Sequence, residues 1–357
     1  MTEIAASARP HVRVLLTAAE AYPALEEAFL QSQAEIWGSF RIFDLTTRLR
    51  GARARAVGET WFDLLVHTLR RGVAVTMVIS DFDPIARSAL HRGSWRSVRQ
   101  FYAAAEVAGP GAKLTVRAAM HAARTGILPR LAFWPVIYHK LSRICAGLNA
   151  MPPEVRRARL RDMPGLSRQL RDTSGGIRPR LWPVPQAYPA THHQKLAVFD
   201  RKLLYIGGLD LDERRYDTPD HDRPGSQTWH DVQLMIEGPA VAEAQAHLEG
   251  FRAMVAGLVA PQPQRRLLRT LSVRRRFDLP FFGPEPKVQE IAEAHEALIR
   301  RAERLIYLET QFFRDRKLAR ALAAAARANP RLTMILILPA APEDVAFHDS
   351  DGLDARL

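Results

Sequence analysis

The chain has 357 residues, of which 47% are hydrophobic, and carries a formal net charge of +13 with a pI of about 10.5. This length and apolar content are sufficient for two domains or one large domain with a sizeable core, and they exclude an intrinsically disordered chain. The positive charge predicts an anionic partner, which could be phospholipid headgroups, a membrane surface or nucleic acid.

No secretory signal is predicted at the N-terminus. Residues 1–10 have neither the basic cluster nor the apolar run of a signal peptide. No uninterrupted stretch of about 18 apolar residues occurs in the sequence, so no transmembrane helix is predicted. We therefore expect a cytoplasmic protein whose contact with a bilayer is peripheral.

From residue 12 to residue 117, short apolar strands alternate with helices. Residues 73–80 form a continuous run rich in β-branched side chains, which is typical of a strand buried on both faces. The alternation of strand and helix predicts an α/β layer. We expect strands at Val12–Leu16, Ile36–Phe43, Val73–Ser80 and Lys113–Arg117, and helices at Tyr22–Ala34, Thr60–Arg71 and Trp95–Ala108.

The pattern then changes to a basic insertion at about residues 113–190. Its first part, residues 113–180, holds fourteen Lys or Arg and three acidic residues, interleaved with aromatic side chains such as Phe133. Three prolines, Pro129, Pro135 and Pro164, predict that no long helix forms here. Three interpretations remain open: a solvated cap with its aromatics packed inside, an interfacial surface that meets anionic lipid, or a nucleic-acid-binding surface.

A chemical cassette follows the insertion. It reads H-x-K-x4-D-x6-G-G from His193 to Gly208 and occurs once in the sequence. The apolar run Leu196–Phe199 predicts a buried strand, on which His193 and Lys195 point to the same face because side chains alternate. A buried lysine would be costly unless an anion or a carboxylate faced it. The pair suits attack on phosphorus, with the lysine holding a non-bridging oxygen while the histidine bonds the phosphoryl group.

The remainder of the chain repeats the opening order of helix, strand, helix and strand. Residues 260–286 are rich in Pro and Arg and are interpreted as a linker between halves. The second half-sheet ends after two strands and is incomplete on size alone, and no second H-x-K occurs as far as Leu357. We therefore expect the chain to be the N-terminal part of a longer two-cassette protein. We expect a strand at Asp231–Glu237, a helix at Pro239–Val255, helices at Lys287–Arg301 and Lys317–Ala328, and strands at Arg304–Glu309 and Leu332–Leu338.

The cassette and its surroundings resemble the phospholipase D superfamily. The likeness is strongest to phospholipid-cleaving members, including the cardiolipin-synthase-like bacterial proteins. It covers most of the chain and is weak between about residues 113 and 189. The matching segments are Ile42-Phe43-Asp44, His192–Asp200, Tyr205–Leu211, Trp229–Val232, Glu237–Val241 and Ile306–Phe313, with Thr310 where the family usually has Asn.

The resemblance implies a reaction in two steps through a phosphohistidine. We assign His193 as the nucleophile and Lys195 to the phosphate oxygens. Alternation places His192 on the opposite face of the strand, where we expect it to be structural. Asp231 matches the carboxylate that holds the far nitrogen of the histidine in lipid-cleaving relatives. Asp200 belongs to the catalytic motif, but simple alternation places it on the other face of the strand, where we expect it to tie the strand to the turn.

Four further residues are predicted to bind substrate. Gly207 and Gly208 would let the backbone approach a phosphate closely or would permit a bulge. Asp210 is at a position where the family often has Asn or Asp, which suggests hydrogen bonding near the pocket. Glu309 resembles a pocket-lining residue of the family.

No cofactor and no metal are predicted. His192, His193, His221 and His230, with nearby aspartates, could build a metal site, but the sequence has no H-E-x-x-H and no closely spaced histidine pair at i, i+4. The acidic stretch Asp210–Asp222 is interpreted as a solvated loop near the mouth of the pocket. Cys145 is the only cysteine, which excludes an internal disulfide and a Cys-rich metal site.

These observations predict an α/β fold of the phospholipase D type, a mixed sheet flanked by helices, with pseudo-two-fold halves of which the second is incomplete. Residues 1–259 would form the first half, 260–286 the linker and 287–357 the start of the second half. The expected function is hydrolysis of phospholipids or transfer of their phosphatidyl group, with a second catalytic half supplied in cis or by dimerisation. A one-cassette dimeric endonuclease and a non-catalytic fragment that binds anionic lipid remain as alternatives.

Overall fold

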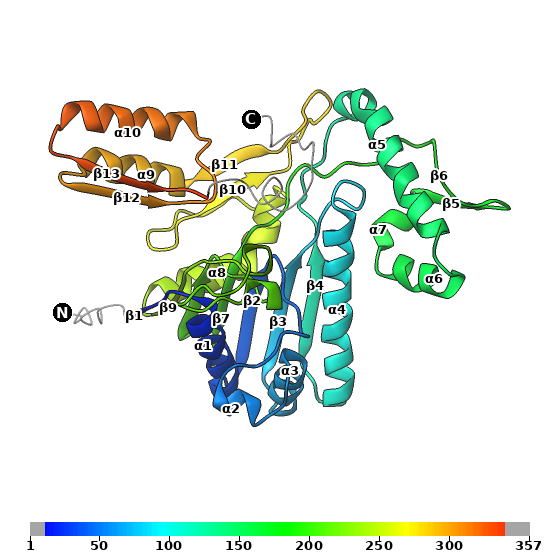
Figure 1. Ribbon diagram of the computed structural model, residues 1–357, viewed down its shortest axis with the longest axis horizontal. Helices are drawn as coiled ribbons and strands as arrows, with labels where there is room; N and C mark the ends of the chain where they lie inside the picture. Colours follow the sequence, from blue (N-terminus) through cyan, green and yellow to red (C-terminus); the bar gives the residue numbers. More distant parts are fainter. Residues whose placement is uncertain (1–10, 340–357) are drawn as a thin grey trace. The chain divides into compact units, whose positions relative to one another are not determined.

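The computed structural model describes residues 11–339 (Figure 1). The chain forms two compact units, which are described separately. The first contains residues 11–223, 227–267 and 272–285, and the second contains residues 224–226, 268–271 and 286–339. Residues 340–357, which we expected to belong to the second half, lie outside the described range. The division into two halves and its boundaries therefore remain predictions.

A seven-stranded mixed sheet with the order β1-β9-β8-β7-β2-β3-β4 forms the centre of the first unit. The strands β2, β3 and β4 run parallel, whereas β7 pairs antiparallel with β2, and β8, β9 and β1 continue the antiparallel part. The predicted mixed α/β sheet is therefore confirmed. The strands are β1 Val12–Leu15, β2 Glu35–Phe40, β3 Ala74–Ser80, β4 Leu114–Ala119, β7 Lys195–Phe199, β8 Leu203–Gly207 and β9 Gln233–Glu237.

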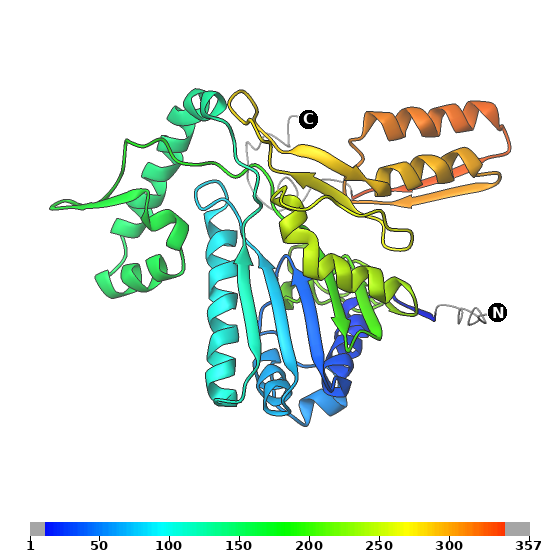
Figure 2. The ribbon, with the colours of Figure 1, turned by 180° about the vertical axis from the view of Figure 1, so that it is seen from behind.

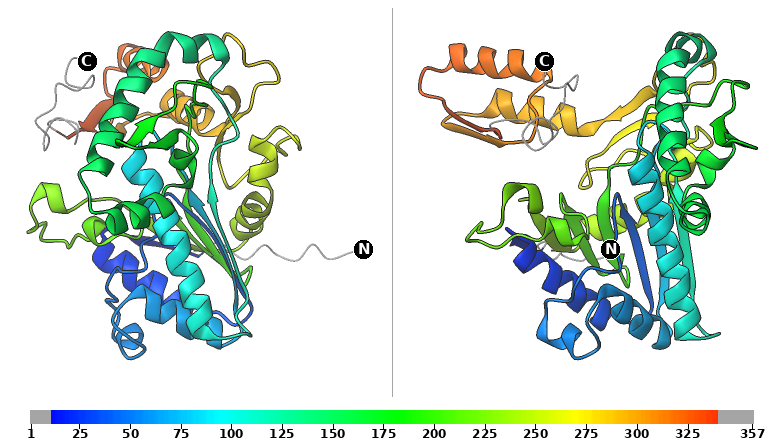
Figure 3. Two further views of the ribbon diagram at one scale, coloured as in Figure 1. Left: turned by 90° about the vertical axis from the view of Figure 1, so that its right-hand side faces the viewer. Right: turned by 45° about the vertical axis from the view of Figure 1, so that its right-hand side comes forward.

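Helices cover both faces of this sheet. The helices α1, α3 and α4 pack with one another over one face, and α8 contacts β2, β7, β8 and β9 on the other. Figure 2 shows α8 crossing in front of β7 and β8, and Figure 3 shows α4 running along the sheet. The helices of these layers are α1 Ala18–Gln31, α2 Ala52–Arg55, α3 Trp61–Arg70, α4 Ser88–Ala108 and α8 Ala240–Val255.

The side chains of β7 divide between the two faces. Ala197 and Phe199 belong to the core beneath α1 and α3, where the ring of Phe199 lies 5.6 Å from that of Phe29. Leu196 and Val198 belong to the smaller core beneath α8. The strand is therefore buried on both faces, which explains its uninterrupted apolar sequence and fixes the direction in which its first residues point.

The basic insertion departs from the prediction that prolines would prevent a long helix. α5 runs from Ile127 to Asn149 and includes Pro129 and Pro135. Pro129 lies in the first turn, where a backbone N–H has no intrahelical partner to lose. Pro135 removes the hydrogen bond to the carbonyl of Leu131, which lies on the exposed side of the helix where water can replace it. Two short helices and a hairpin follow: α6 Pro153–Arg161, α7 Pro164–Ser167, β5 Leu170–Thr173 and β6 Gly176–Pro179.

The insertion has a small core of its own. Leu141, Cys145 and Leu148 of α5 are buried against Met163, Leu166, Leu170 and Ile177. The aromatic side chains are not all packed inside, since Phe133 is 50% exposed and the neighbouring aliphatic residues Leu128, Leu131 and Val136 are also exposed. The interpretation as a solvated cap with a buried aromatic interior is therefore wrong for the start of α5.

In the second unit, the strands β12 and β13 pair in parallel, and α9 packs against α10. Ile299, Ile306 and Leu322 form the centre of its core. Among the described residues neither strand pairs with a third strand. The side chains of Ile335, Leu336 and Ile337 in β13 are exposed. The elements are α9 Glu290–Arg301, β12 Leu305–Glu309, α10 Arg316–Ala328 and β13 Thr333–Ile337.

The segment interpreted as a linker contains regular structure. β10 Thr270–Val273 and β11 Glu285–Gln289 form a two-stranded sheet. The expected helix from Lys287 therefore begins only at Glu290, because residues 285–289 are used by β11. No helix within residues 11–339 is both long enough and apolar enough to cross a bilayer.

Asp200 fixes the far end of β7. Its carboxylate accepts hydrogen bonds from the backbone N–H groups of Gln33, Ala34 and Glu35 at 2.8 to 2.9 Å. Asp200 and the following Arg201 adopt φ values of +48° and +55°, which form the tight turn into β8. The side chain thus joins the β7–β8 turn to the segment between α1 and β2, where it satisfies three donors that have no partner in a strand or helix.

We expect Asp200→Ala to lower the free energy of unfolding by about 1–2 kcal/mol, because three N–H groups lose a charged acceptor. Although burial opposes the effect, these donors hold the pKa of Asp200 below its ordinary value. The stabilisation is therefore present above the unfolded pKa of about 4 and is lost as the pH falls through the lower folded value. Urea unfolding of the native chain and of Asp200→Ala at several pH values measures the loss of stability and its pH dependence, with Asp220→Ala as an exposed control. An equal loss in the two variants at neutral pH would contradict the prediction.

Candidate active site

Strand register gathers the cassette at one end of the sheet. Lys195 at the start of β7 pairs with Phe40 at the end of β2, and Gly207 at the end of β8 pairs with Gln233 at the start of β9. The residues that follow β2 and β8 therefore meet the residues that precede β7 and β9. At this end of the sheet, His193 and Lys195 lie together with Asp210 and two arginines.

The imidazole of His193 lies beside the ammonium of Lys195. The Lys195 Nζ is 3.3 Å from Nδ1 and 3.4 Å from Nε2 of the ring, as the predicted alternation along the strand requires. His193 is exposed whereas Lys195 is only 6% exposed. Partial desolvation, followed by the positive charges of Lys195, Arg41 and Arg215, lowers the pKa of His193 to about 4. The ring is therefore neutral near pH 7, which is the state that a nucleophilic or basic imidazole requires.

Asp210 provides the carboxylate that the buried lysine needs. Its Oδ2 lies 3.8 Å from Lys195 Nζ and 3.8 Å from Arg41 Nη1, and its Oδ1 accepts a hydrogen bond of 2.9 Å from the N–H of Ile42. Burial raises the pKa of Asp210, although the neighbouring cations oppose this shift, and burial lowers the pKa of Lys195. Asp210 thus lies behind the lysine as a partly compensating charge, and its position agrees with a hydrogen-bonding residue close to the site.

Two arginines of the site were missed from the sequence. Arg41 directly follows β2 and pairs with Asp210 at 3.8 Å. Arg215 is half-buried, its guanidinium lies 4.2 Å from the centre of the Trp229 ring, and its charge acts on His193, Lys195 and Asp210. Arg41 could have been found from its place at the end of a predicted strand. Arg215 is in the acidic stretch that we interpreted as a solvated loop, where no spacing rule indicates which charge turns inward.

Asp231 is near the cassette but does not hold the imidazole. Its Oδ1 accepts a hydrogen bond of 2.9 Å from the N–H of Val232, and no bond joins Asp231 to the ring of His193 within the described part of the chain. Its negative charge does act on Lys195. The proposed orienting contact is therefore not formed in this structure, and the role of Asp231 stays a prediction.

Gly207 and Gly208 allow close packing between β8 and β9. A Cβ atom at Gly207 would lie 2.0 Å from the side-chain Oε1 of Gln233, and one at Gly208 would lie 2.0 Å from Oδ1 of Asp231. No larger residue fits at either position without a shift of these neighbours. The Cβ positions of the two glycines are thus occupied by protein side chains, and the role of Gly207 and Gly208 in substrate binding stays a prediction.

Asp200 is not part of this cluster, and Glu309 belongs to the second unit, so its predicted role stays a prediction. Asp200 is at the opposite end of β7 from Lys195 and bonds to backbone N–H groups there. Glu309 ends β12 in the second unit, where its Oε2 accepts a hydrogen bond from the hydroxyl of Tyr307. His192, which we expected to be structural, is buried on the opposite face of β7 with its ring 5.2 Å from that of Phe251 in α8.

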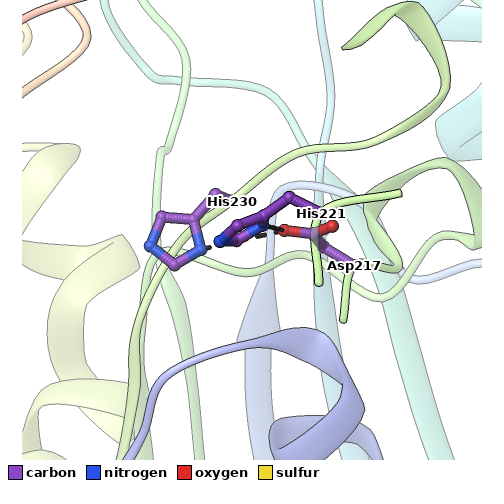
Figure 4. Close-up of side chains that lie close together, drawn as sticks. All are labelled: Asp217, His221 and His230. Atoms are coloured by element: carbon purple, nitrogen blue, oxygen red, sulfur yellow. Dashed lines mark hydrogen bonds and ion pairs between the residues drawn. The ribbon is translucent and has the colours of Figure 1, made fainter. Parts of the chain in front are cut away.

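Asp217, His221 and His230, which belong to the chain segment that connects β8 to β9, form a separate group (Figure 4). Each offers one ligand atom, and these three atoms lie within 4.8 Å of one another. They are among the residues that we considered as metal ligands before predicting that no metal binds. Their arrangement is the only such cluster found among the described residues.

Comparison with known proteins gives relatives of one kind. No family model matches the sequence. Phospholipase D alpha 1 of Nicotiana tabacum is 22% identical over 43% of this chain and 31% of its own length. Phospholipase D delta of Arabidopsis thaliana is 30% identical over 16% of this chain and 10% of its own length. The chain thus spans less than a third of the length of these curated relatives.

Among solved structures, the phospholipase D family member Nuc of Salmonella typhimurium is similar with a TM-score of 0.32 and 13% identity, covering 68% of this chain and 94% of that one. NucT of Helicobacter pylori gives a TM-score of 0.33 and 9% identity over the same shares. Because these TM-scores are low, the fold is assigned from the observed sheet and its helices and not from these two structures.

Removal of Lys195 should raise the pKa of His193. We expect an NMR titration of the His193 imidazole to give a midpoint near pH 4 in the native chain and a higher midpoint in Lys195→Met, because the imidazolium form loses a repelling neighbour. Lys140→Met, which removes an exposed lysine of α5, serves as the matched control and should leave the midpoint unchanged. A native midpoint close to the ordinary value of about 6.5 would contradict the prediction.

Proposed function

We propose that this chain, which belongs to the phospholipase D superfamily, contributes one catalytic half of an enzyme that cleaves or transfers phospholipid phosphodiesters through a phosphohistidine at His193. The observation that carries the proposal is a neutral, exposed imidazole in contact with a buried lysine. The charges of Arg41 and Arg215 make the same edge attractive to an anion. A phosphodiester combines this negative charge with an electrophilic phosphorus atom, so both features of the site are used.

In the first step a ring nitrogen of His193 attacks phosphorus. A nitrogen–phosphorus bond forms as the bond from phosphorus to the oxygen of the headgroup alcohol breaks, and this alcohol takes a proton from a general acid. Lys195 stabilises the negative charge that gathers on the non-bridging oxygens in the transition state. Because Lys195 is desolvated, its interaction with that charge is stronger than it would be in water.

In the second step water or an acceptor alcohol attacks the phosphohistidine. The attacking oxygen loses its proton to a general base, the new oxygen–phosphorus bond forms, and the bond to His193 breaks, which gives phosphatidic acid or a new phospholipid. A second H-x-K cassette would supply the acid and the base, and the sequence holds only one. The proposal therefore requires a second half, either in a longer polypeptide or from a partner copy.

A lipid substrate is favoured by an apolar surface beside the basic insertion. The segment Asp278–Phe282 lies along the start of α5: the Leu128 N–H donates to Leu279 O, and the rings of Phe133 and Phe282 are 5.8 Å apart. Phe133 and Phe282 are 50% and 57% exposed. Exposed aromatic side chains within a strongly basic region are typical of proteins that bind the headgroup layer of anionic membranes.

Substitution of the cassette should abolish turnover. With the full-length gene product and mixed phosphatidylcholine and phosphatidylglycerol vesicles, we expect His193→Ala and Lys195→Ala to reduce release of the headgroup alcohol by roughly 10³-fold or more. The native protein should accumulate an acid-labile phosphoryl adduct on His193 when quenched during turnover. His139→Ala, an exposed histidine of α5, is the control and should keep the native rate. Full activity of His193→Ala would reject the proposal.

Two other outcomes would identify the alternatives. Nicking of plasmid DNA by a homodimer, without hydrolysis of lipid, would indicate a one-cassette endonuclease. Sedimentation with anionic vesicles, without turnover of either substrate by the full-length protein, would indicate a non-catalytic lipid-binding role.

The apolar surface should contribute to membrane binding. We expect Phe133→Ser and Phe282→Ser each to reduce co-sedimentation with phosphatidylglycerol vesicles severalfold, because each removes an exposed apolar side chain next to basic residues. Val107→Ser, an equally exposed apolar residue on α4, is the matched control and should bind as the native chain does. Unchanged binding of both phenylalanine variants would show that lipid contacts lie elsewhere.

A further inference from the structure

Two imidazoles face one buried carboxylate in the chain between β8 and β9. Asp217 is 1% exposed, and its Oδ2 lies 2.6 Å from Nδ1 of His221 and 3.9 Å from Nδ1 of His230. The two rings stand nearly perpendicular, with centres 5.3 Å apart (Figure 4). Oδ1 of Asp217 has no hydrogen-bond partner within the described part of the chain. Among the described residues this buried carboxylate thus has a single side-chain donor, and the imidazole of His230 lies beyond hydrogen-bonding distance from it.

We propose that Asp217, His221 and His230 bind a divalent transition-metal ion of the Zn²⁺ type. Two imidazole nitrogens and one carboxylate oxygen form a ligand set that suits Zn²⁺ and leaves a fourth position for water. Imidazole nitrogens do not suit Mg²⁺ or Ca²⁺, which prefer oxygen ligands. The ion would also neutralise the charge of a carboxylate that is otherwise incompletely paired.

Small side-chain rotations are sufficient to form the site. Bonds of about 2.0–2.2 Å to a tetrahedral ion place the ligand atoms roughly 3.2–3.6 Å from one another. The present separations of 2.6 and 3.9 Å from the Asp217 oxygen lie on either side of this range. The side chains of His221 and His230 are 56% and 39% exposed and so have room to adjust. Asp217 is held in place, since its carbonyl accepts a hydrogen bond from the N–H of Ala19 in α1.

The ion would act on the active site through Arg215. Arg215 precedes Asp217 by two residues and stacks on Trp229, which directly precedes His230. A metal bound to both Asp217 and His230 would therefore hold the chain next to Arg215 close to the chain next to Trp229, and so would stabilise the contact between these two residues. It would keep the arginine charge close to Lys195 and Asp210. This positioning effect rests on the proposed function, whereas binding of the metal does not.

Titration with metal alone tests the inference. On tag-free protein freed of metal by a chelator, calorimetry should show one equivalent of Zn²⁺ bound, and Co²⁺ should give the intense visible absorption of a four-coordinate ion. His221→Ala and His230→Ala should each weaken Zn²⁺ binding by at least about tenfold, because each removes a direct ligand. Mg²⁺ should not compete. Acidification should also weaken binding, since the ligating imidazoles must be deprotonated.

His139→Ala, which removes a distant exposed histidine, should bind Zn²⁺ as the native chain does. Asp217→Asn tests the buried ligand, with circular dichroism as the check that the variant folds. Absence of Zn²⁺ uptake by the native chain, or equal affinity in His221→Ala, His230→Ala and the native protein, would overturn the proposal. Because no substrate is used, this result is independent of whether His193 forms a phosphohistidine.

Discussion

The burial of Lys195 is the constraint on which the site depends. An ammonium removed from water costs several kcal/mol unless opposite charge compensates it. Asp210 supplies that charge, and it is itself held by the N–H of Ile42. The end of β2, the start of β7 and the residues after β8 must therefore come together before the lysine can be buried. Folding of this end of the sheet and assembly of the candidate site are consequently the same event.

The sequence was sufficient to predict the central features. Alternation along β7 correctly placed His193 beside Lys195 and His192 on the other face, because a strand buried on both sides allows no other register. The requirement that a carboxylate face a buried lysine was met by Asp210. The mixed sheet followed from the order of strands and helices. These predictions succeeded because each depends on local periodicity or on the cost of burying a single charge.

Features set by tertiary contact could not be predicted. Pro135 was expected to break a helix, yet α5 continues through it because the freed carbonyl lies on the exposed side. Arg215 turns inward from a loop with no periodicity, since its environment is built by Trp229 fourteen residues later. In the group of Asp217, His221 and His230, the first two residues are only four positions apart, whereas His230 lies just before β9 and joins them through the fold. Spacing rules for metal ligands apply within one element and do not detect such a convergence.

The second unit has a consequence for how the protein behaves in concentrated solution. Its β12–β13 pair is a parallel sheet of two strands, and such sheets are normally covered on both faces and extended by further strands. Ile335, Leu336 and Ile337 are exposed along β13, whose outer edge has unpaired backbone groups among the described residues. An apolar edge that has no neighbouring strand among the described residues can recruit strands from neighbouring molecules. Preparations of this polypeptide should therefore be prone to concentration-dependent self-association, which added charge on β13 would suppress.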